Sequence, residues 1–130
     1  MKNYRGIWPV APTAFHPDGT LDDDGNRRIM DCMVDQGSDG VCILANYSEQ
    51  FLLSDIEREN LTRLSLEHVA GRVPVIVTIS HFATDIAVAR AVQAKDMGAD
   101  VVMMLAPYHG ALIKRTPAQT FEQFARVGDV

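Results

Sequence analysis

The sequence predicts an α/β fold of four βα units with parallel strands. Four apolar runs recur along the chain, at residues 6–13, 40–46, 73–80 and 100–107. The last three are nearly continuous rather than alternating, which is typical of strands covered on both faces of a parallel sheet. A stretch of helical period follows each run, and this strand–helix alternation implies right-handed crossovers between parallel strands.

The first unit consists of the run "GIWPVAPT" at residues 6–13 and a helix from about Asp22 to Gln36. Four apolar residues line one side of that helix: Ile29, Met30, Met33 and Val34. Gly37 follows directly and is expected to end the helix, because glycine adopts at little cost the left-handed backbone that often follows a helix.

The second unit joins the run "GVCILAN" at residues 40–46 to a helix that begins at Ser54. Glu57 lies three residues after Ser54, which is the spacing of a capping box, where each side chain binds the other residue's backbone N–H. We expect this helix to end near Gly71.

The third unit combines the strand 73–80 with a helix from about Thr84 to Gly98. In the fourth unit, the strand 100–107 precedes a helix that begins at Thr116. Four more residues characterise this last helix: Pro117 at its first position, Gln119 as the reciprocal cap, and Phe121 and Phe124, which begin its apolar stripe.

Segments 35–44 and 96–105 align without a gap. Five positions are identical: Asp35/Asp96, Gly37/Gly98, Asp39/Asp100, Val41/Val102 and Leu44/Leu105. Each glycine is placed to end a helix before the chain turns into a strand. Two explanations remain open, an internal repeat of the βα unit and the convergent use of one type of turn.

Composition predicts one soluble globular domain over residues 1–130, since the net charge is -5 and 47% of the residues are hydrophobic. No basic patch appears, so we expect no nucleic-acid partner, and no run approaches the roughly 18 apolar residues of a membrane span. The N-terminus lacks the apolar core of a signal peptide. Cys32 and Cys42 lack C-x-x-C spacing, so we expect reduced core cysteines in a cytoplasmic protein.

The residues alone leave two architectures open. One is a doubly wound open sheet, and the other is half of a (β/α)₈ barrel, which usually takes about 250 residues. No Gly-x-Gly-x-x-Gly fingerprint of dinucleotide binding follows the first strand. In both architectures ligands bind beyond the C-terminal ends of the strands.

The candidate site residues therefore follow the four strands, and they are Thr13, then Asn46, Tyr47 and Ser48, then His81, then Tyr108 and His109. They are neutral and rich in hydrogen-bond donors, which favours a small oxygenated anion over a divalent metal. We predict no metal site, because His81, His109 and Glu49 show no metal-ligand spacing. Ser48 lacks the flanking glycines of a nucleophile elbow, so serine hydrolysis is not expected.

Several motifs together resemble the N-terminal half of the dihydrodipicolinate synthase / N-acetylneuraminate lyase family. They are "GIWPVAPTAFHPDGTLD", "GSDGVCILANYSEQFLLSDIER", "GRVPVIV" and "PYHG". The resemblance covers essentially the whole chain and implies the first half of a TIM barrel. It is closest to the branch that converts 2-keto-3-deoxy-L-arabonate to 2-ketoglutarate semialdehyde with loss of water.

The sequence departs from the family pattern at two places. Where the family usually has Gly-Thr-Thr-Gly-Glu, this chain has Ala-Asn-Tyr-Ser-Glu at residues 45–49. In the family this loop holds the substrate carboxylate, so Asn46 and Tyr47 are expected to supply donors in place of the threonines. Where the family usually has Pro-Tyr-Tyr, His109 replaces the second tyrosine, which in the family reaches into a neighbouring subunit's site.

The resemblance implies covalent catalysis, in which a lysine forms a Schiff base with the ketone of a 2-keto acid and no cofactor is needed. The same resemblance implies catalytic roles for Tyr108 and His109, and a homo-oligomer, a tetramer in the family. The family lysine lies on the sixth strand, and neither Lys95 nor Lys114 matches its motif. We therefore expect the 130-residue chain alone to be inactive. Alternatives are a pyruvate-dependent aldolase of the same family and a non-catalytic half barrel that acts through assembly.

Overall fold

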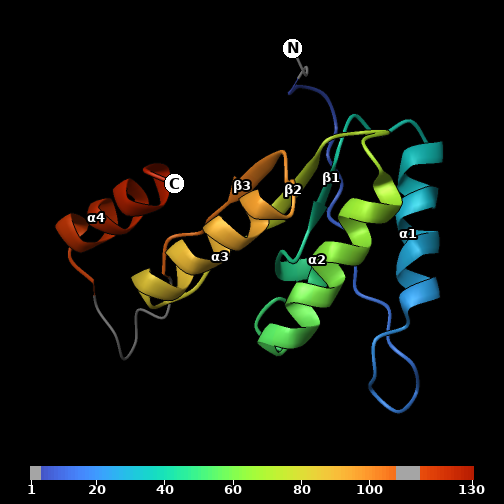
Figure 1. Cartoon of the computed structure of the whole chain (residues 1–130), viewed down its shortest axis with the longest axis horizontal. Coiled ribbons are helices and arrows are strands. Elements are labelled where there is room, and N and C mark those ends of the chain that lie inside the picture. Colours follow the sequence, from blue (N-terminus) through green and yellow to red (C-terminus); the bar gives the residue numbers. More distant parts are fainter. Residues whose placement is uncertain (1–3, 108–114) are drawn as a thin grey trace.

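The computed structural model describes residues 4–107 and 115–130. The described elements follow the order α1 (Asp23–Asp35), β1 (Val41–Ile43), the 3₁₀ turn η1 (Asn46–Ser48), α2 (Asp55–Val69), β2 (Val75–Thr78), α3 (Thr84–Asp96), β3 (Val101–Met103) and α4 (Pro117–Gly128). Figure 1 shows the four helices arranged in chain order from α1 to α4. Among the described residues, no helix is long and apolar enough to cross a membrane.

The three strands form one parallel sheet in the order β1-β2-β3. The register pairs Val41 with Val75 and Val77 with Val102. The predicted parallel arrangement is therefore confirmed, and it brings the C-terminal ends of neighbouring strands to one edge of the sheet.

The predicted first strand at residues 6–13 forms only one isolated bridge, in which Val10 pairs in parallel with Cys42. The N–H of Cys42 donates to the carbonyl of Pro9, and the N–H of Ala11 donates to Cys42. Pro9 and Pro12 carry no N–H, so this segment cannot form a regular ladder with a strand on either side. The prediction of a full strand was wrong, although the segment lies beside β1 as expected.

The predicted helix starts are confirmed. The side chain of Ser54 accepts from the N–H of Glu57 and the Glu57 carboxylate accepts from the N–H of Ser54, which is the expected capping box. Thr116 and Gln119 make the same reciprocal pair at α4, with Pro117 in the first turn. The end of α2 differs slightly from the prediction, since Ala70 already adopts the left-handed conformation.

The two aligned segments perform the same structural task. Gly37 and Gly98 have positive φ values of 83° and 89°. The carboxylate of Asp39 accepts from the N–H of Ile7, and the carboxylate of Asp100 accepts from the N–H of Val75. Each aspartate thus binds the start of the neighbouring segment, the one before the Val10 bridge or strand β2, at the N-terminal edge of the sheet.

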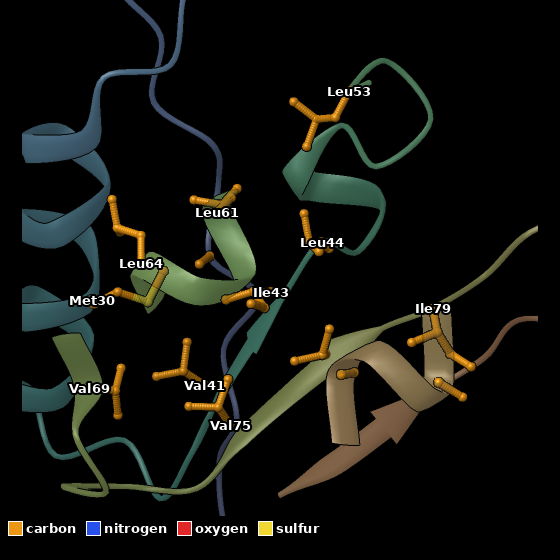
Figure 2. Packing of buried hydrophobic residues seen from close by; sticks show 14 residues of the cluster. Met30, Val41, Ile43, Leu44, Leu53, Leu61, Leu64, Val69, Val75 and Ile79 are labelled. Atoms are coloured by element: carbon orange, nitrogen blue, oxygen red, sulfur yellow. The ribbon is translucent and has the colours of Figure 1, made fainter. Parts of the chain in front are cut away.

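The core lies between the sheet and the helices. Figure 2 shows Met30 of α1 and Leu64 of α2 beside Ile43 and Val41 of β1. Alternate strand residues point to the opposite face, where Ile76, Val101 and Met103 are only partly buried. That face is less well covered than the helix-facing one, as expected for half of a barrel.

Two predictions about burial were wrong. Cys32 is exposed and accepts a hydrogen bond from the Gln36 amide, whereas Cys42 is buried as expected. Phe121 and Phe124 of α4 are exposed, and Gln123 is the fully buried residue of that helix. Gln123 takes this place because its amide donates to the carbonyl of His81.

Candidate functional site

Thr13 and Ser48, two of the predicted site residues, meet at the C-terminal edge of the sheet. The hydroxyl of Thr13 donates to the carbonyl of Ser48 over 2.8 Å. The Ser48 hydroxyl is buried, donates to the carbonyl of Ala11 over 2.5 Å and accepts from the N–H of Ala45 over 3.1 Å. Both hydroxyls therefore hold the η1 turn against residues 11–13, which directly follow the isolated bridge at Val10.

Asn46 and Tyr47, the other two residues of η1, are exposed, and 81% of Tyr47 is accessible to solvent. The turn's own backbone bonds use the N–H groups of Ser48 and Glu49. The N–H groups of Asn46 and Tyr47 are not needed for the turn, since the first N–H groups of any helical turn have no partner within it. The side-chain donors of both residues and their N–H groups are thus available to an anion.

Left-handed backbone lies on both sides of this turn. Leu44 has φ 58° and Glu49 has φ 57°. A residue with a side chain adopts this conformation at a cost of about 1 kcal/mol or more, and such residues concentrate at binding sites and clamps. The contacts around Leu44 and Glu49 therefore hold the backbone on both sides of residues 45–48 in a conformation that is unfavourable by itself.

The guanidinium of Arg58 stabilises this conformation. Arg58 is buried, and it donates to the carbonyl of Gln50 over 2.9 Å and to the carbonyl of Thr78 over 2.8 Å. The first carbonyl follows η1 and the second ends β2, so Arg58 ties two loops of the site together. Burial, with a smaller contribution from Arg90, lowers the pKa of Arg58 to about 10, so the side chain stays charged at neutral pH.

His81, which follows β2, is partly buried. Its Nδ1 accepts a hydrogen bond from the N–H of Ala83 over 2.9 Å, so the neutral ring carries its proton on Nε2. Burial and then the positive charge of Arg90 lower the pKa of His81 below its ordinary value of 6.5. The ring is therefore a neutral N–H donor at pH 7.

The backbone that carries His81 is held from several sides. Arg90 of α3 donates to the carbonyl of Ser80, and the Ser80 hydroxyl accepts from the N–H of Leu105. Gln123 of α4 donates to the carbonyl of His81 and is itself bound by Arg115. Helices α3 and α4 thus position this loop in the way that Arg58 positions η1.

Tyr108 and His109, the predicted catalytic residues, and Lys114 lie outside the described residues. Lys95 occupies the last turn of α3, where its ammonium donates to the carbonyl of Val130. That turn leads into the N-terminal end of β3, so Lys95 lies at the edge of the sheet opposite to η1. Within 4–107 and 115–130, no three His, Cys, Asp or Glu side chains are grouped to hold a metal ion.

A groove of about 470 Å³ runs between α2 and α3, on the helix side of the sheet. Arg58, Arg90 and Asp55 line it together with apolar residues, and none of the predicted site residues does. Both arginines are already bound, Arg58 to two backbone carbonyls and Arg90 to Ser80 and to the carboxylate of Asp55. The groove therefore shares Arg58 with the candidate site but contains none of its proposed ligand donors.

Sequence reasoning did not identify Gln50 and Arg58. A signal for Arg58 exists, because helical side chains lean towards the N-terminus and a residue one turn after the Ser54 cap can reach the preceding loop. Gln50 is 2% exposed, although glutamine is usually an exposed residue. Its partners depend on the shape of η1, which the sequence pattern does not specify.

Comparison with known proteins identifies close relatives. The sequence model of the dihydrodipicolinate synthetase family matches residues 3–130. The chain is 56% identical over 126 residues to the L-2-keto-3-deoxyarabonate dehydratase of Azospirillum brasilense, which covers 97% of this chain and 41% of that protein. It is 31% identical to a 4-hydroxy-tetrahydrodipicolinate synthase of Protochlamydia amoebophila, over 95% of this chain and 40% of that protein.

Among solved structures, YagE from Escherichia coli K12, crystallised in complex with pyruvate, superposes with a TM-score of 0.91 at 29% identity. The match covers 97% of this chain and 41% of that chain. The chain thus spans about two fifths of the length of the relatives that it matches. Its fold is the N-terminal half of a TIM barrel.

Proposed function

Because this chain belongs to the dihydrodipicolinate synthetase family, we propose that it is the substrate-anchoring half of a Schiff-base lyase. The proposed reaction removes water from a 2-keto-3-deoxy sugar acid and converts 2-keto-3-deoxy-L-arabonate to 2-ketoglutarate semialdehyde. One observation carries the proposal. Asn46 and Tyr47 are held by Ser48 and Thr13 as exposed donors at the C-terminal edge of the sheet, in a chain 56% identical to a dehydratase for that acid.

In the proposed complex, donors from η1 bind the carboxylate of the 2-keto acid. The Asn46 amide, the Tyr47 hydroxyl and their N–H groups supply neutral donors, and the charge-assisted bonds to an anion are stronger than neutral ones. The Nε2–H of His81 is a further donor for an oxygen of the substrate. Fixing the carboxylate aligns the ketone with the groups that react.

The covalent step needs a lysine. Its amine would add to the ketone with loss of water to give a Schiff base, which makes a proton on C3 acidic. Removal of that proton lets the C4 hydroxyl leave as water once it is protonated. Tautomerisation and hydrolysis of the Schiff base then release the semialdehyde and regenerate the lysine. We propose Tyr108 and His109 as the groups that move these protons, as the family resemblance implies.

Neither Lys95 nor Lys114 fits the lysine role, so we propose that the 130-residue chain alone does not form the Schiff base. Lys95 lies at the edge of the sheet opposite to η1, which supports this part of the proposal. A cytoplasmic location and a homo-oligomeric state, with His109 directed towards a neighbouring subunit, belong to the same proposal.

The test is an assay of the complete gene product with 2-keto-3-deoxy-L-arabonate. We expect 2-ketoglutarate semialdehyde to form, and reduction with borohydride in the presence of substrate to stop turnover. Production of pyruvate and an aldehyde instead would favour the alternative function, a pyruvate-dependent aldolase. The 31% identity of this chain to a 4-hydroxy-tetrahydrodipicolinate synthase supports that alternative.

A non-catalytic half barrel is the alternative from a different class. The partly exposed face of the sheet at Ile76, Val101 and Met103 favours it, because such a face invites association with another chain. A gene product that neither reacts with a 2-keto acid nor binds pyruvate, yet forms a stable dimer in sedimentation experiments, would support this alternative.

A further inference from the structure

The side chain of Gln50 is unusual among the residues of the site. It is 2% exposed, and its Nε2 donates to the Oδ1 of Asn46 over 2.8 Å. Its Oε1 is buried without a hydrogen-bond partner among the described residues. A buried acceptor without a partner costs about 1–3 kcal/mol, so an apolar residue of similar length would be a more stable choice at this position.

The hydrogen bond from Gln50 determines which way the Asn46 amide faces. An amide has one side that accepts and one side that donates. Because Nε2 can only donate, it holds the Oδ1 of Asn46 on the inner side of the loop. The Nδ2 group of Asn46 is thereby turned away from Gln50, and Asn46 itself is exposed.

The backbone of Gln50 is fixed independently of its side chain. Its carbonyl accepts from Arg58, and its N–H donates to the carbonyl of Ala45. The side chain is therefore not required to hold the loop, and the hydrogen bond that it makes among the described residues acts on Asn46 alone.

We propose that Gln50 is a positioning residue that orients the Asn46 amide so that Nδ2 faces the substrate carboxylate. This inference rests on the proposed function of Asn46 as a carboxylate anchor. Gln50 does not touch the substrate. Without Gln50, the Asn46 amide could turn its oxygen towards the ligand, and that oxygen would repel the substrate carboxylate.

The experiment measures pyruvate affinity and the melting temperature for four forms of the complete gene product: the native protein, Gln50→Met, Gln50→Glu and the control Gln36→Met. Pyruvate is the probe because it is the smallest 2-keto acid. Gln36 is a matched control, since it is an exposed glutamine whose amide binds Cys32 at the end of α1. The side-chain amide signal of Asn46 in ¹⁵N NMR spectra reports its hydrogen bonding directly.

We expect Gln50→Met to melt at the same or a higher temperature and to bind pyruvate about fivefold more weakly, the equivalent of about one hydrogen bond. Gln50→Glu should weaken binding further, by about tenfold, because an ionised carboxylate only accepts and would attract Nδ2 of Asn46 inwards. The Asn46 amide signal should then be shifted before pyruvate is added. The Gln36→Met control should change neither quantity.

Two results would overturn the inference in distinguishable ways. If Gln50→Met binds pyruvate as the native protein does, or loses affinity only in step with melting temperature, Gln50 does not position Asn46 while the proposed function stands. If pyruvate leaves the Asn46 and Tyr47 signals of the native protein unchanged, the anchoring role itself is wrong, whatever the variants do.

Discussion

The N-terminal and C-terminal edges of the sheet are held by different kinds of contact. At the N-terminal edge, Asp39 and Asp100 repeat one interaction, in which a carboxylate accepts from the N–H at the start of the neighbouring extended segment, Ile7 or Val75. At the C-terminal edge, the contacts of the described residues are more varied. Arg58 binds two carbonyls, Ser48 binds Ala11, and Gln50 binds Asn46. The contacts at the N-terminal edge serve the fold, whereas those at the C-terminal edge hold the loop that carries the exposed donors of Asn46 and Tyr47.

This difference predicts separate effects on stability and on binding. Substitutions at the N-terminal edge should change the free energy of unfolding alone. At the C-terminal edge, substituting a residue that holds the loops, such as Arg58, should lower the free energy of unfolding. Substituting a residue that contacts a ligand, such as Asn46, should instead lower the affinity for that ligand.

The largest effect is expected for Arg58→Met. The variant leaves the carbonyls of Gln50 and Thr78 without their charged donor, and we expect a loss of about 3 kcal/mol in the free energy of unfolding. Urea denaturation measures this loss. Arg63→Met is the control, because Arg63 is exposed and its ion pair with Glu59 contributes about 0.5 kcal/mol or less. Equal losses in the two variants would contradict the role of Arg58.

Next in size is Asn46→Asp. The new side chain still accepts from Gln50 but has lost its donor, and it adds a negative charge beside the substrate carboxylate. We expect pyruvate affinity to fall by about tenfold or more, which equals about 1.4 kcal/mol, with the melting temperature unchanged. Calorimetric titration measures the affinity. Unchanged binding would remove Asn46 from the site.

At the opposite edge, Asp100→Ala should cost about 1 kcal/mol of stability, because the N–H of Val75 loses its acceptor. Asp100→Asn keeps an oxygen at that position and is the matched control. Pyruvate affinity should be the same in both variants. A change in affinity at this edge would show that the two edges are not independent.

The smallest effect concerns acid stability at the Asp31 cluster, where Arg72 and then His68 lower the pKa of Asp31 below its ordinary value of 3.8. A lowered pKa stabilises the folded state fully above pH 3.8 and progressively less as the pH falls through the folded-state pKa. Asp31→Asn should therefore flatten the acid side of a stability profile. Asp24→Asn, on the same helix, is the control. A profile identical to the native one would contradict this prediction.

The sequence predicted the parts of the fold that depend on local chemistry. The caps at Ser54 and Thr116 and the glycines that end α1 and α3 follow from spacing alone. The isolated bridge at Val10 could not be predicted from hydrophobicity, since the apolar run is strand-like and the missing N–H groups of Pro9 and Pro12 disfavour a ladder.

The site could be predicted only in part. The position of Asn46 and Tyr47 follows from the rule that ligands bind beyond the ends of parallel strands. The contacts of Arg58 and Gln50 depend on the left-handed backbone at Leu44 and Glu49, which no local pattern indicates in residues other than glycine. The exposure of Phe121 and Phe124 likewise depends on how α4 is placed by Gln123.

The most direct test of the account combines pyruvate binding with borohydride reduction of the 130-residue chain itself, followed by mass spectrometry. We predict reversible pyruvate binding that shifts the Asn46 and Tyr47 signals, and no covalent adduct on Lys95 or Lys114. A reduced adduct on either lysine, or binding that leaves η1 unaffected, would contradict the claim that this chain carries the anchoring part of the site without its nucleophile.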